Sequence, residues 1–338
     1  MRADALYSLV KLVTLVKKRQ MVLITGGMGF IGLHSARKFL DAGENVIATR
    51  FWTWREPSFL KDEFGRRLIV ESLDTTSPFD CLSLVRKHNV DSIVHLAMPG
   101  LAALSPGEDF RVNMLGLVNL LEAARVAGVR RFTIGSSVTV YGGLEGPFRE
   151  DQPLQVESAS ATGAFKKAFE ILALHYGDRT KLDVIALRIG VIWGPLYHSM
   201  VNMPSRMVHG ALKGGTIDLT QAAGVPGGPS CEEDETDLCY VKDCAKAIQM
   251  VHMATKLNHR IYNVGSGKAS SNARLRDAVL KAVPGVRIVL QAGKSAGYRS
   301  NAYLDLGRIA ADTGYKPEFT MEDGVADYVA WLRAGNSL

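Results

Sequence analysis

A glycine-rich turn within MVLITGGMGFIG, residues 21–32, constrains the fold of this chain more than any other feature. An apolar run at 22–25 precedes the turn, and a helical segment follows it. Strand, turn and helix in this order form a cradle for a dinucleotide phosphate at the positive end of the helix. Gly26 permits the tight turn, Gly29 lets the backbone approach a pyrophosphate, and Gly32 lets helix and strand pack closely. The motif predicts a dinucleotide-binding domain.

The end of the second strand-like segment, NVIAT, indicates which dinucleotide binds. The strand ends at Arg50, where an acidic residue would hydrogen-bond the ribose of NAD and repel a 2′-phosphate. Because an Arg does the opposite, we predict that NADP is preferred, with NAD as the alternative. A solvated Arg in a loop that also carries Arg55 would explain the same residue.

Alternating strand-like and helix-like segments continue through the first half of the chain. Strand patterns at 66–74, 91–100 and 131–143 are separated by helical patterns at 81–89 and 109–129. This alternation predicts an α/β fold with a doubly wound parallel sheet, a Rossmann fold. Ligands of such sheets bind at the carboxyl ends of the strands. Those ends are predicted to hold Gly26, Arg50, Asp74, Ala97 and Ser137.

Composition excludes several classes of partner. The net charge of +6 is small for 338 residues, and Lys and Arg are scattered, so a nucleic-acid partner is not expected. The four cysteines have no ligand-like spacing, which favours neither a metal site nor a disulfide framework and suggests a reducing cytoplasm. The N-terminal extension, residues 1–20, is expected to pack on the domain, to fray or to touch a membrane surface. Its apolar run is too short for stable membrane insertion.

Several motifs together resemble the extended short-chain dehydrogenase/reductases, the group of UDP-galactose epimerase, nucleotide-sugar dehydratases and many alcohol or ketone oxidoreductases. The motifs are TGGMGFIG at 25–32, HLA at 95–97, SSVTVYG at 136–142, RIGVIWGP at 188–195, YVKDCAKAI at 240–248 and IYNVGSG at 261–267. Asp74, and Asn113 with Gly116, add to the likeness, which covers nearly everything after Met21.

The resemblance implies a domain organisation and a set of cofactor contacts. It implies a Rossmann domain at 21–190 with return segments at about 238–265, and a smaller C-terminal substrate-binding domain made mainly of 191–237 and 266–338. It further implies a homodimer through a four-helix bundle of segments 110–127 and 162–177. The implied cofactor residues, besides the three glycines and Arg50, are Phe30, Ile31, Asp74, Leu96, Ala97, Asn113 and Lys166.

In the family that this chain resembles, a Tyr transfers the proton, a Lys four residues later binds the cofactor ribose, and a Ser orients the substrate oxygen. The resemblance assigns the Ser to Ser137 and the Lys to Lys166, although a strand cap and a solvated helix residue would explain them too. Thr162 stands where the Tyr is expected. An aliphatic hydroxyl is a far weaker acid than a phenol and cannot replace it.

Three interpretations of the missing phenol stay open. The first is an oxidoreductase in which the proton moves through Tyr141, Ser137, His198 or a water held by Thr162. The second is an isomerase or lyase, of the epimerase or dehydratase type, that uses the cofactor transiently. The third is an NADP-binding module with little turnover. We predict the first, because Ser137 and Lys166 both persist and a purely binding role would not require them.

The C-terminal half favours a small substrate over a nucleotide sugar. Val191 and Thr236 stand where nucleotide-sugar members of the family have an Asn and an Arg. We therefore expect hydride transfer on a small carbonyl or secondary alcohol. The predicted substrate-binding residues are Met98, Ser137, Val191, Trp193, His198 and Arg299.

Overall fold

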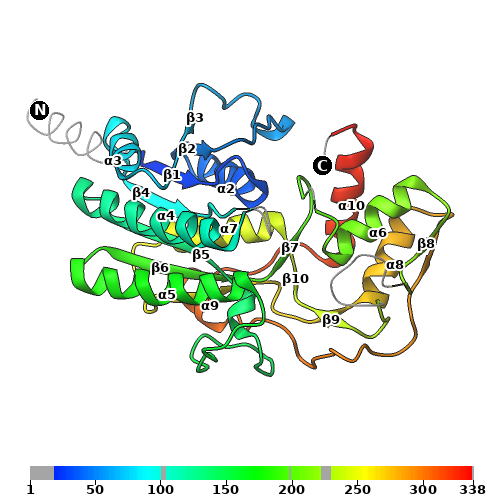
Figure 1. Ribbon diagram of the computed structural model, residues 1–338. Coiled ribbons are helices and arrows are strands. Elements are labelled where there is room, and N and C mark those ends of the chain that lie inside the picture. Colours follow the sequence, from blue (N-terminus) through cyan, green and yellow to red (C-terminus); the bar gives the residue numbers. More distant parts are fainter. Residues whose placement is uncertain (1–18, 100–103, 198, 222–229, 337–338) are drawn as a thin grey trace, which may run out of the picture.

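A seven-stranded parallel sheet forms the centre of the computed structural model, which describes residues 19–99, 104–197, 199–221 and 230–336 (Figure 1). The strand order is β11-β6-β5-β4-β1-β2-β3. The strands are β1 (Met21–Thr25), β2 (Asn45–Arg50), β3 (Leu68–Ser72), β4 (Ser92–His95), β5 (Arg131–Ser137), β6 (Asp183–Ile189) and β11 (Ile261–Val264). All but the last two residues of the N-terminal extension lie outside the described residues, as does His198.

Helices cover both faces of this sheet. On one face lie α2 (Phe30–Asp41), α7 (Val241–Met253) and α9 (Gly307–Thr313), and on the other α3 (Pro78–Lys87), α4 (Pro106–Ala127) and α5 (Ala161–Thr180). The side chains of β1 alternate between the two faces of the sheet. Val22 and Ile24 pack on the face of α2 and α7, and Leu23 packs on the face of α3 and α4. The predicted doubly wound fold is confirmed.

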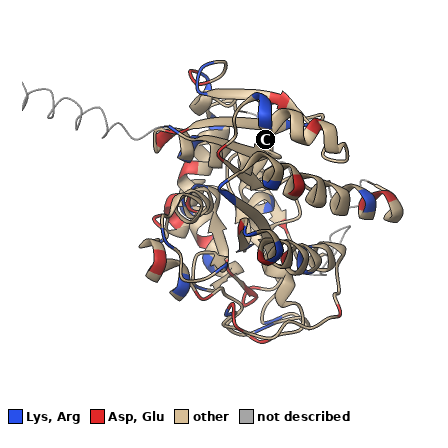
Figure 2. Cartoon of the chain, turned by 90° about the vertical axis from the view of Figure 1, so that its left-hand side faces the viewer, with Lys and Arg blue, Asp and Glu red and all other residues tan. Residues whose placement is uncertain are grey.

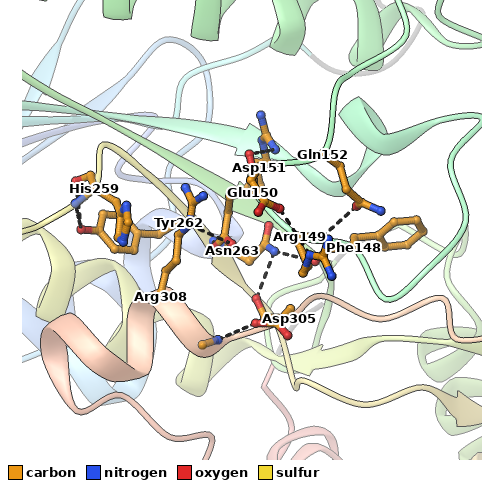
Figure 3. A network of polar contacts seen from close by, with 12 residues as sticks. Phe148, Arg149, Glu150, Asp151, Gln152, His259, Tyr262, Asn263, Asp305 and Arg308 are labelled. Atoms are coloured by element: carbon orange, nitrogen blue, oxygen red, sulfur yellow. Dashed lines mark hydrogen bonds and ion pairs between the residues drawn. The ribbon is translucent and has the colours of Figure 1, made fainter.

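The last strand of the sheet comes from late in the chain. β11 pairs in parallel with β6, with Ile261 opposite Ala186 and Val264 opposite Ile189. The side chain of Asn263 on β11 donates to the carbonyl oxygens of Phe148 and Asp305, and its backbone N–H donates to Glu150, as Figure 3 shows. These bonds fasten segments from three parts of the chain to one edge of the sheet.

The remaining elements gather around a separate apolar cluster, to which Trp193, Tyr240 and Tyr328 belong. The helices are α6 (Met203–Lys213), α8 (Asn272–Ala282) and α10 (Met321–Arg333). The strands form three pairs: β7 (Val191–Trp193) with β10 (Leu238–Tyr240), β8 (Thr216–Asp218) with β13 (Arg287–Val289), and β9 (Glu235–Thr236) with β12 (Ser270–Ser271). Short 3₁₀ turns, η1 (Ser58–Leu60) and η2 (Val138–Tyr141), complete the fold.

Charged residues of both signs are mixed along the described part of the chain. Figure 2 shows Lys and Arg interspersed with Asp and Glu on the side of the molecule that it presents. In the described part of the chain, no helix is both long enough and apolar enough to cross a bilayer.

A buried ion pair joins helix α5 to strand β6. Arg188 on β6 donates to both carboxylate oxygens of Glu170 on α5, and the two side chains are only 3% and 5% exposed. Ser136 on β5 donates its hydroxyl proton to the same carboxylate. The desolvation cost of two buried charges is met here by several hydrogen bonds within one network.

Removing one partner of this pair should destabilise the protein strongly. We expect Glu170→Ala to lower the free energy of unfolding by about 3–5 kcal/mol, because Arg188 is left as a buried charge without its partner. Denaturant unfolding measures the change. Asp41→Asn is the matched control, since Asp41 pairs with Arg37 on the surface and should contribute under about 1 kcal/mol. Equal losses in both variants would contradict this account of the buried pair.

Candidate active site

A cavity of about 470 Å³ opens at the carboxyl ends of the central strands. The glycine-rich turn, the ends of β4, β5 and β6, the first turns of α5, and the segment from β7 to Tyr197 all contribute to its wall. This is where ligands of doubly wound sheets bind. Among the residues predicted from sequence, the structure brings the following to the cavity wall: Gly26, Gly29, Phe30, Ile31, Gly32, Leu96, Met98, Ser137, Thr162, Lys166 and Val191.

The glycine turn is shaped so closely that side chains do not fit. A Cβ added to Gly32 would lie 2.4 Å from the carbonyl oxygen of Gly26, and Gly26 itself has a φ of +67°. Helix α2 then begins without a side-chain cap and without an acidic residue in its first turn. Its free N–H groups and positive end therefore face the cavity ready for an anion. These features fit a dinucleotide pyrophosphate.

Lys166 reaches the cavity from inside the protein. Its side chain is 7% exposed, and its Nζ donates to the carbonyl oxygen of Gly135 at 2.6 Å. Burial lowers the pKa of this amine to about 8, an effect that the nearby Glu170 carboxylate partly offsets. The amine thus stays mostly charged at neutral pH and loses its proton slightly above it.

Thr162 and Ser137 flank this lysine at the cavity wall. Helix α5 begins at Ser160, whose hydroxyl accepts from the N–H of Gly163, and this cap puts Thr162 one turn before Lys166. The Ser137 hydroxyl oxygen accepts from the backbone and the hydroxyl of Thr139, at 3.2 and 3.0 Å. Two aliphatic hydroxyls and one amine are therefore gathered where the sequence predicted a catalytic group.

Tyr141 does not take part in this group. Its ring is 1% exposed and does not line the cavity. The phenol donates to Asn263 at 2.8 Å and accepts from Arg188 at 2.9 Å, and burial raises its pKa to about 12. In this position the phenol connects η2 with the sheet edge, and its part in moving the proton stays a prediction.

Two predicted substrate contacts also lie elsewhere. Trp193 is 1% exposed, packs edge-on against Tyr240 with 4.9 Å between ring centroids, and belongs to the core of the C-terminal part. Arg299 is exposed on a loop and does not line the cavity. A strand end or a family position fixes the course of the backbone but not the direction of a side chain, and the contacts of both residues with a substrate stay predictions.

The remaining predicted cofactor residues surround the cavity without lining it. The backbone of Ala97 packs under Gly26, at 2.9 Å from where a Cβ would stand. Asp74 is exposed and accepts from Thr76, and Asn113 donates to the backbone of Asp109. Their contacts with a dinucleotide stay predictions.

Arg50 lies at the end of β2, as predicted, and its guanidinium lies 5.4 Å from the ring centroid of Trp54. This stacking keeps the charge next to the sheet edge where the adenosine half of a dinucleotide is expected.

Sequence reasoning missed two polar residues of the described cavity wall, Ser136, whose hydroxyl donates to Glu170, and Tyr197. Tyr197 follows the GPL turn after β7, and its ring meets Phe30 edge-on with 5.1 Å between centroids. The available signal for Tyr197 was its place just after the RIGVIWGP motif, four residues after β7.

The comparisons with known proteins agree with this geometry. The model of the NAD dependent epimerase/dehydratase family matches residues 22–265. An uncharacterized UDP-glucose epimerase, YtcB, of Bacillus subtilis is 28% identical over 92% of this chain and 97% of that protein. A dTDP-glucose 4,6-dehydratase of an Actinoplanes species is 27% identical over 94% of this chain and 98% of its own.

Solved structures share the fold. The UDP-glucose 4-epimerase of Thermotoga maritima with UDP-glucose has a TM-score of 0.78 at 20% identity, covering 94% of this chain and 99% of its own. That of Thermus thermophilus in complex with NAD has a TM-score of 0.75 at 24% identity, covering 94% of this chain and 100% of its own. The fold and the cradle define a Rossmann-type enzyme class that binds nicotinamide dinucleotides. Within that class, the chain belongs to the NAD dependent epimerase/dehydratase family, as the resemblance to extended short-chain dehydrogenase/reductases predicted.

Proposed function

We propose that this protein transfers hydride between a nicotinamide dinucleotide and a carbon that bears oxygen in a small carbonyl or secondary alcohol substrate. The observation that carries the proposal is the shared cavity of the glycine cradle, Ser137 and Lys166. The cradle would hold the pyrophosphate, and Lys166 would hold the adjoining ribose by its charge. A bound nicotinamide supplies or accepts the hydride. The Ser137 hydroxyl orients the substrate oxygen, and the apolar side chains of Met98 and Val191 exclude water from the reacting carbon.

A nucleotide-sugar epimerase or dehydratase is the second candidate. The relatives with similar sequences are named for such activities, and the UDP-glucose 4-epimerase of Thermotoga maritima shares the fold of this chain. Against it, Val191 lines the cavity with a side chain that offers no hydrogen bond to a diphosphate or a base. A cofactor-binding module with little turnover is the third candidate, because Thr162 supplies no acid of suitable strength.

We infer that NADP is preferred over NAD. NAD is the alternative, because the similar structures of a Bacillus anthracis dTDP-glucose 4,6-dehydratase and of the Thermus thermophilus epimerase are complexes with NAD. Arg50 is half-buried at the end of β2, and its guanidinium stacks on Trp54. A preordered guanidinium at this edge suits a 2′-phosphate, which it can bind through two parallel hydrogen bonds.

We further propose a homodimer through helices α4 and α5. The two helices pack side by side, with the rings of Phe110 and Phe165 at 6.2 Å between centroids. Apolar side chains remain on their outer surface, including Phe110 at 62%, Val118 at 47% and Ile171 at 68% exposed. A contiguous apolar surface on two adjacent helices suits a twofold four-helix interface.

The division of labour between the two halves of the chain is likewise a proposal. We assign the cofactor to residues 21–190 with the return at 238–265, and the substrate mainly to 191–237 and 266–338. One apolar cluster draws most of its residues from the second part, Met207, Leu275 and Tyr328 among them, which supports this division. All four cysteines are buried free thiols, which supports a reducing cytoplasm as the compartment.

Turnover with a defined set of substrates tests the main proposal. We expect the protein to oxidise NADPH in the presence of at least one member of a panel of small ketones and aldehydes. The loss of NADPH absorbance measures this turnover. Lys166→Ala should weaken NADPH binding and reduce turnover by about tenfold or more, because a buried cation is lost, whereas Lys256→Ala on the surface should change neither.

UDP-glucose and dTDP-glucose are incubated in parallel with NAD and analysed by chromatography. Conversion of a nucleotide sugar alone would select the second candidate, and saturable binding without any turnover the third.

Arg50 should determine the choice of cofactor. We expect Arg50→Ala to weaken NADPH binding about 10- to 100-fold and NADH binding by less than about threefold, because a charge-assisted contact to the phosphate is removed. Fluorescence titration with each nucleotide measures both constants. Lys61→Ala removes one exposed charge from the same region as a control. An equal loss for both nucleotides, or tighter binding of NADH by the unchanged protein, would exclude the assignment.

The interface should fail when a charge is placed in it. Ile171→Asp is expected to shift the protein from dimer to monomer in analytical ultracentrifugation, because the carboxylate would be desolvated in an apolar contact. Val156→Asp is the matched control, since Val156 is 97% exposed and belongs to neither helix. A monomeric unchanged protein, or a dimer that survives Ile171→Asp, would refute the interface.

A further inference from the structure

The cavity contains one phenol, although not from the helix where the sequence led us to expect it. Of the described residues that line it, only Lys166 and Tyr197 have side chains that ionise in water. Thr162, on α5, and Ser137, at the end of β5, are aliphatic alcohols, which are far weaker acids than a phenol. Tyr141 is bonded elsewhere. Tyr197 is therefore the only candidate phenol within the described wall.

The backbone around Tyr197 is held firmly in place. The Nε2 of His34 contacts the carbonyl oxygen of Pro195 at 3.0 Å, and Arg55 donates to the carbonyl oxygen of Leu196 at 3.3 Å. The N–H of Tyr197 donates to Gly194 at 3.2 Å. Three different parts of the chain thus fix three consecutive residues, which gives the ring a defined position before any ligand binds.

Leu196 adds a second sign that this position is functional. Its φ is +74°, in the left-handed region that few residues other than glycine adopt, and its side chain is 2% exposed. Such a conformation costs of the order of 1 kcal/mol or more and is typical of functional sites. Here the turn brings the next residue, Tyr197, to the cavity wall, where its ring rests against Phe30.

The hydroxyl of Tyr197 is available for chemistry. It makes no hydrogen bond to any residue that the structure describes, and the side chain is only half-buried. Within the same cavity lie the Lys166 amine and the uncapped start of α2, both of which favour a negative charge nearby. The phenol therefore shares the cavity with the groups that are predicted to hold the cofactor.

We propose that Tyr197 is the catalytic acid and base of this cavity, in the place of the phenol that α5 lacks. This inference rests on the proposed function. In the direction of reduction, the carbonyl carbon gains hydride, its π electrons move to oxygen, and that oxygen takes the proton of the Tyr197 hydroxyl. The phenolate then regains a proton from water. In oxidation the same steps run in reverse, and no further reactant is needed.

Two measurements on the full-length protein test this assignment. We expect Tyr197→Phe to reduce kcat by about 10²- to 10⁴-fold on the substrate that the panel identifies, as for other lost acid–base groups. The Kd of NADPH, measured by fluorescence, should change by less than about threefold. A merely structural role of the side chain would not produce this combination of a reduced kcat and an unchanged Kd. Tyr303→Phe, a phenol that does not line the cavity, serves as the control.

Chemical labelling provides a readout that needs no turnover. Tetranitromethane should nitrate Tyr197 in the protein without ligand, and NADP⁺ should protect it, with the peptide identified by mass spectrometry. Nitration that NADP⁺ leaves unchanged would overturn the placement of this phenol beside the cofactor. A Tyr197→Phe variant with kcat within about threefold of the unchanged protein would overturn its role alone. A protein that turns over no substrate would overturn the proposed function and, with it, this assignment.

Discussion

The close approach of backbone at the glycine turn is the constraint on which the rest of this structure depends. Gly32 lies so near the carbonyl of Gly26 that a Cβ would stand 2.4 Å from it, and a Cβ on Gly27 would stand 2.6 Å from Ala48. The first contact brings α2 down on the end of β1, and the second packs the turn against β2. Because the sheet is built outward from β1, a helix start displaced here would move one wall of the cavity relative to the other.

A second constraint acts at the opposite wall. The Arg188–Glu170 pair and Ser136 fix α5 against β5 and β6 without exposing a charge. Glu170 is one turn after Lys166, so the same helical face carries both the anchor and the cavity amine. Since Glu170 is occupied by Arg188 and Ser136, the Lys166 amine donates to a neutral carbonyl instead. The amine also lies 5.1 Å from the centroid of the Phe169 ring, so the contacts that the structure describes for its Nζ are with uncharged groups.

The sequence was sufficient for the fold and for one wall of the cavity, for reasons that the structure makes plain. Glycine spacing and strand–helix alternation are local properties, so the cradle at Gly26 and the doubly wound sheet could be predicted from them. Lys166 and Thr162 could be placed because one helical turn relates them. Trp193, at the end of β7, and Tyr141, in η2, could not, because their side chains turn into cores that form only when distant segments such as β10 and β11 pack. The position of Tyr197 could not be predicted either, because it depends on the left-handed conformation of Leu196, which the residue types in GPLY do not indicate.

Two unfavourable features meet at this cavity, and their coincidence bears on the absent tyrosine of α5. Burial disfavours the charge of Lys166, and Leu196 holds a strained backbone. Neither feature stabilises the fold, since an apolar residue would be buried at lower cost and a glycine would relax the turn. Buried charges and strained backbone of this kind occur mainly at functional sites. If Tyr197 acts as we propose, the phenol that α5 lacks is supplied by the turn after β7, and Thr162 then marks a relocation of acid–base chemistry and not its loss.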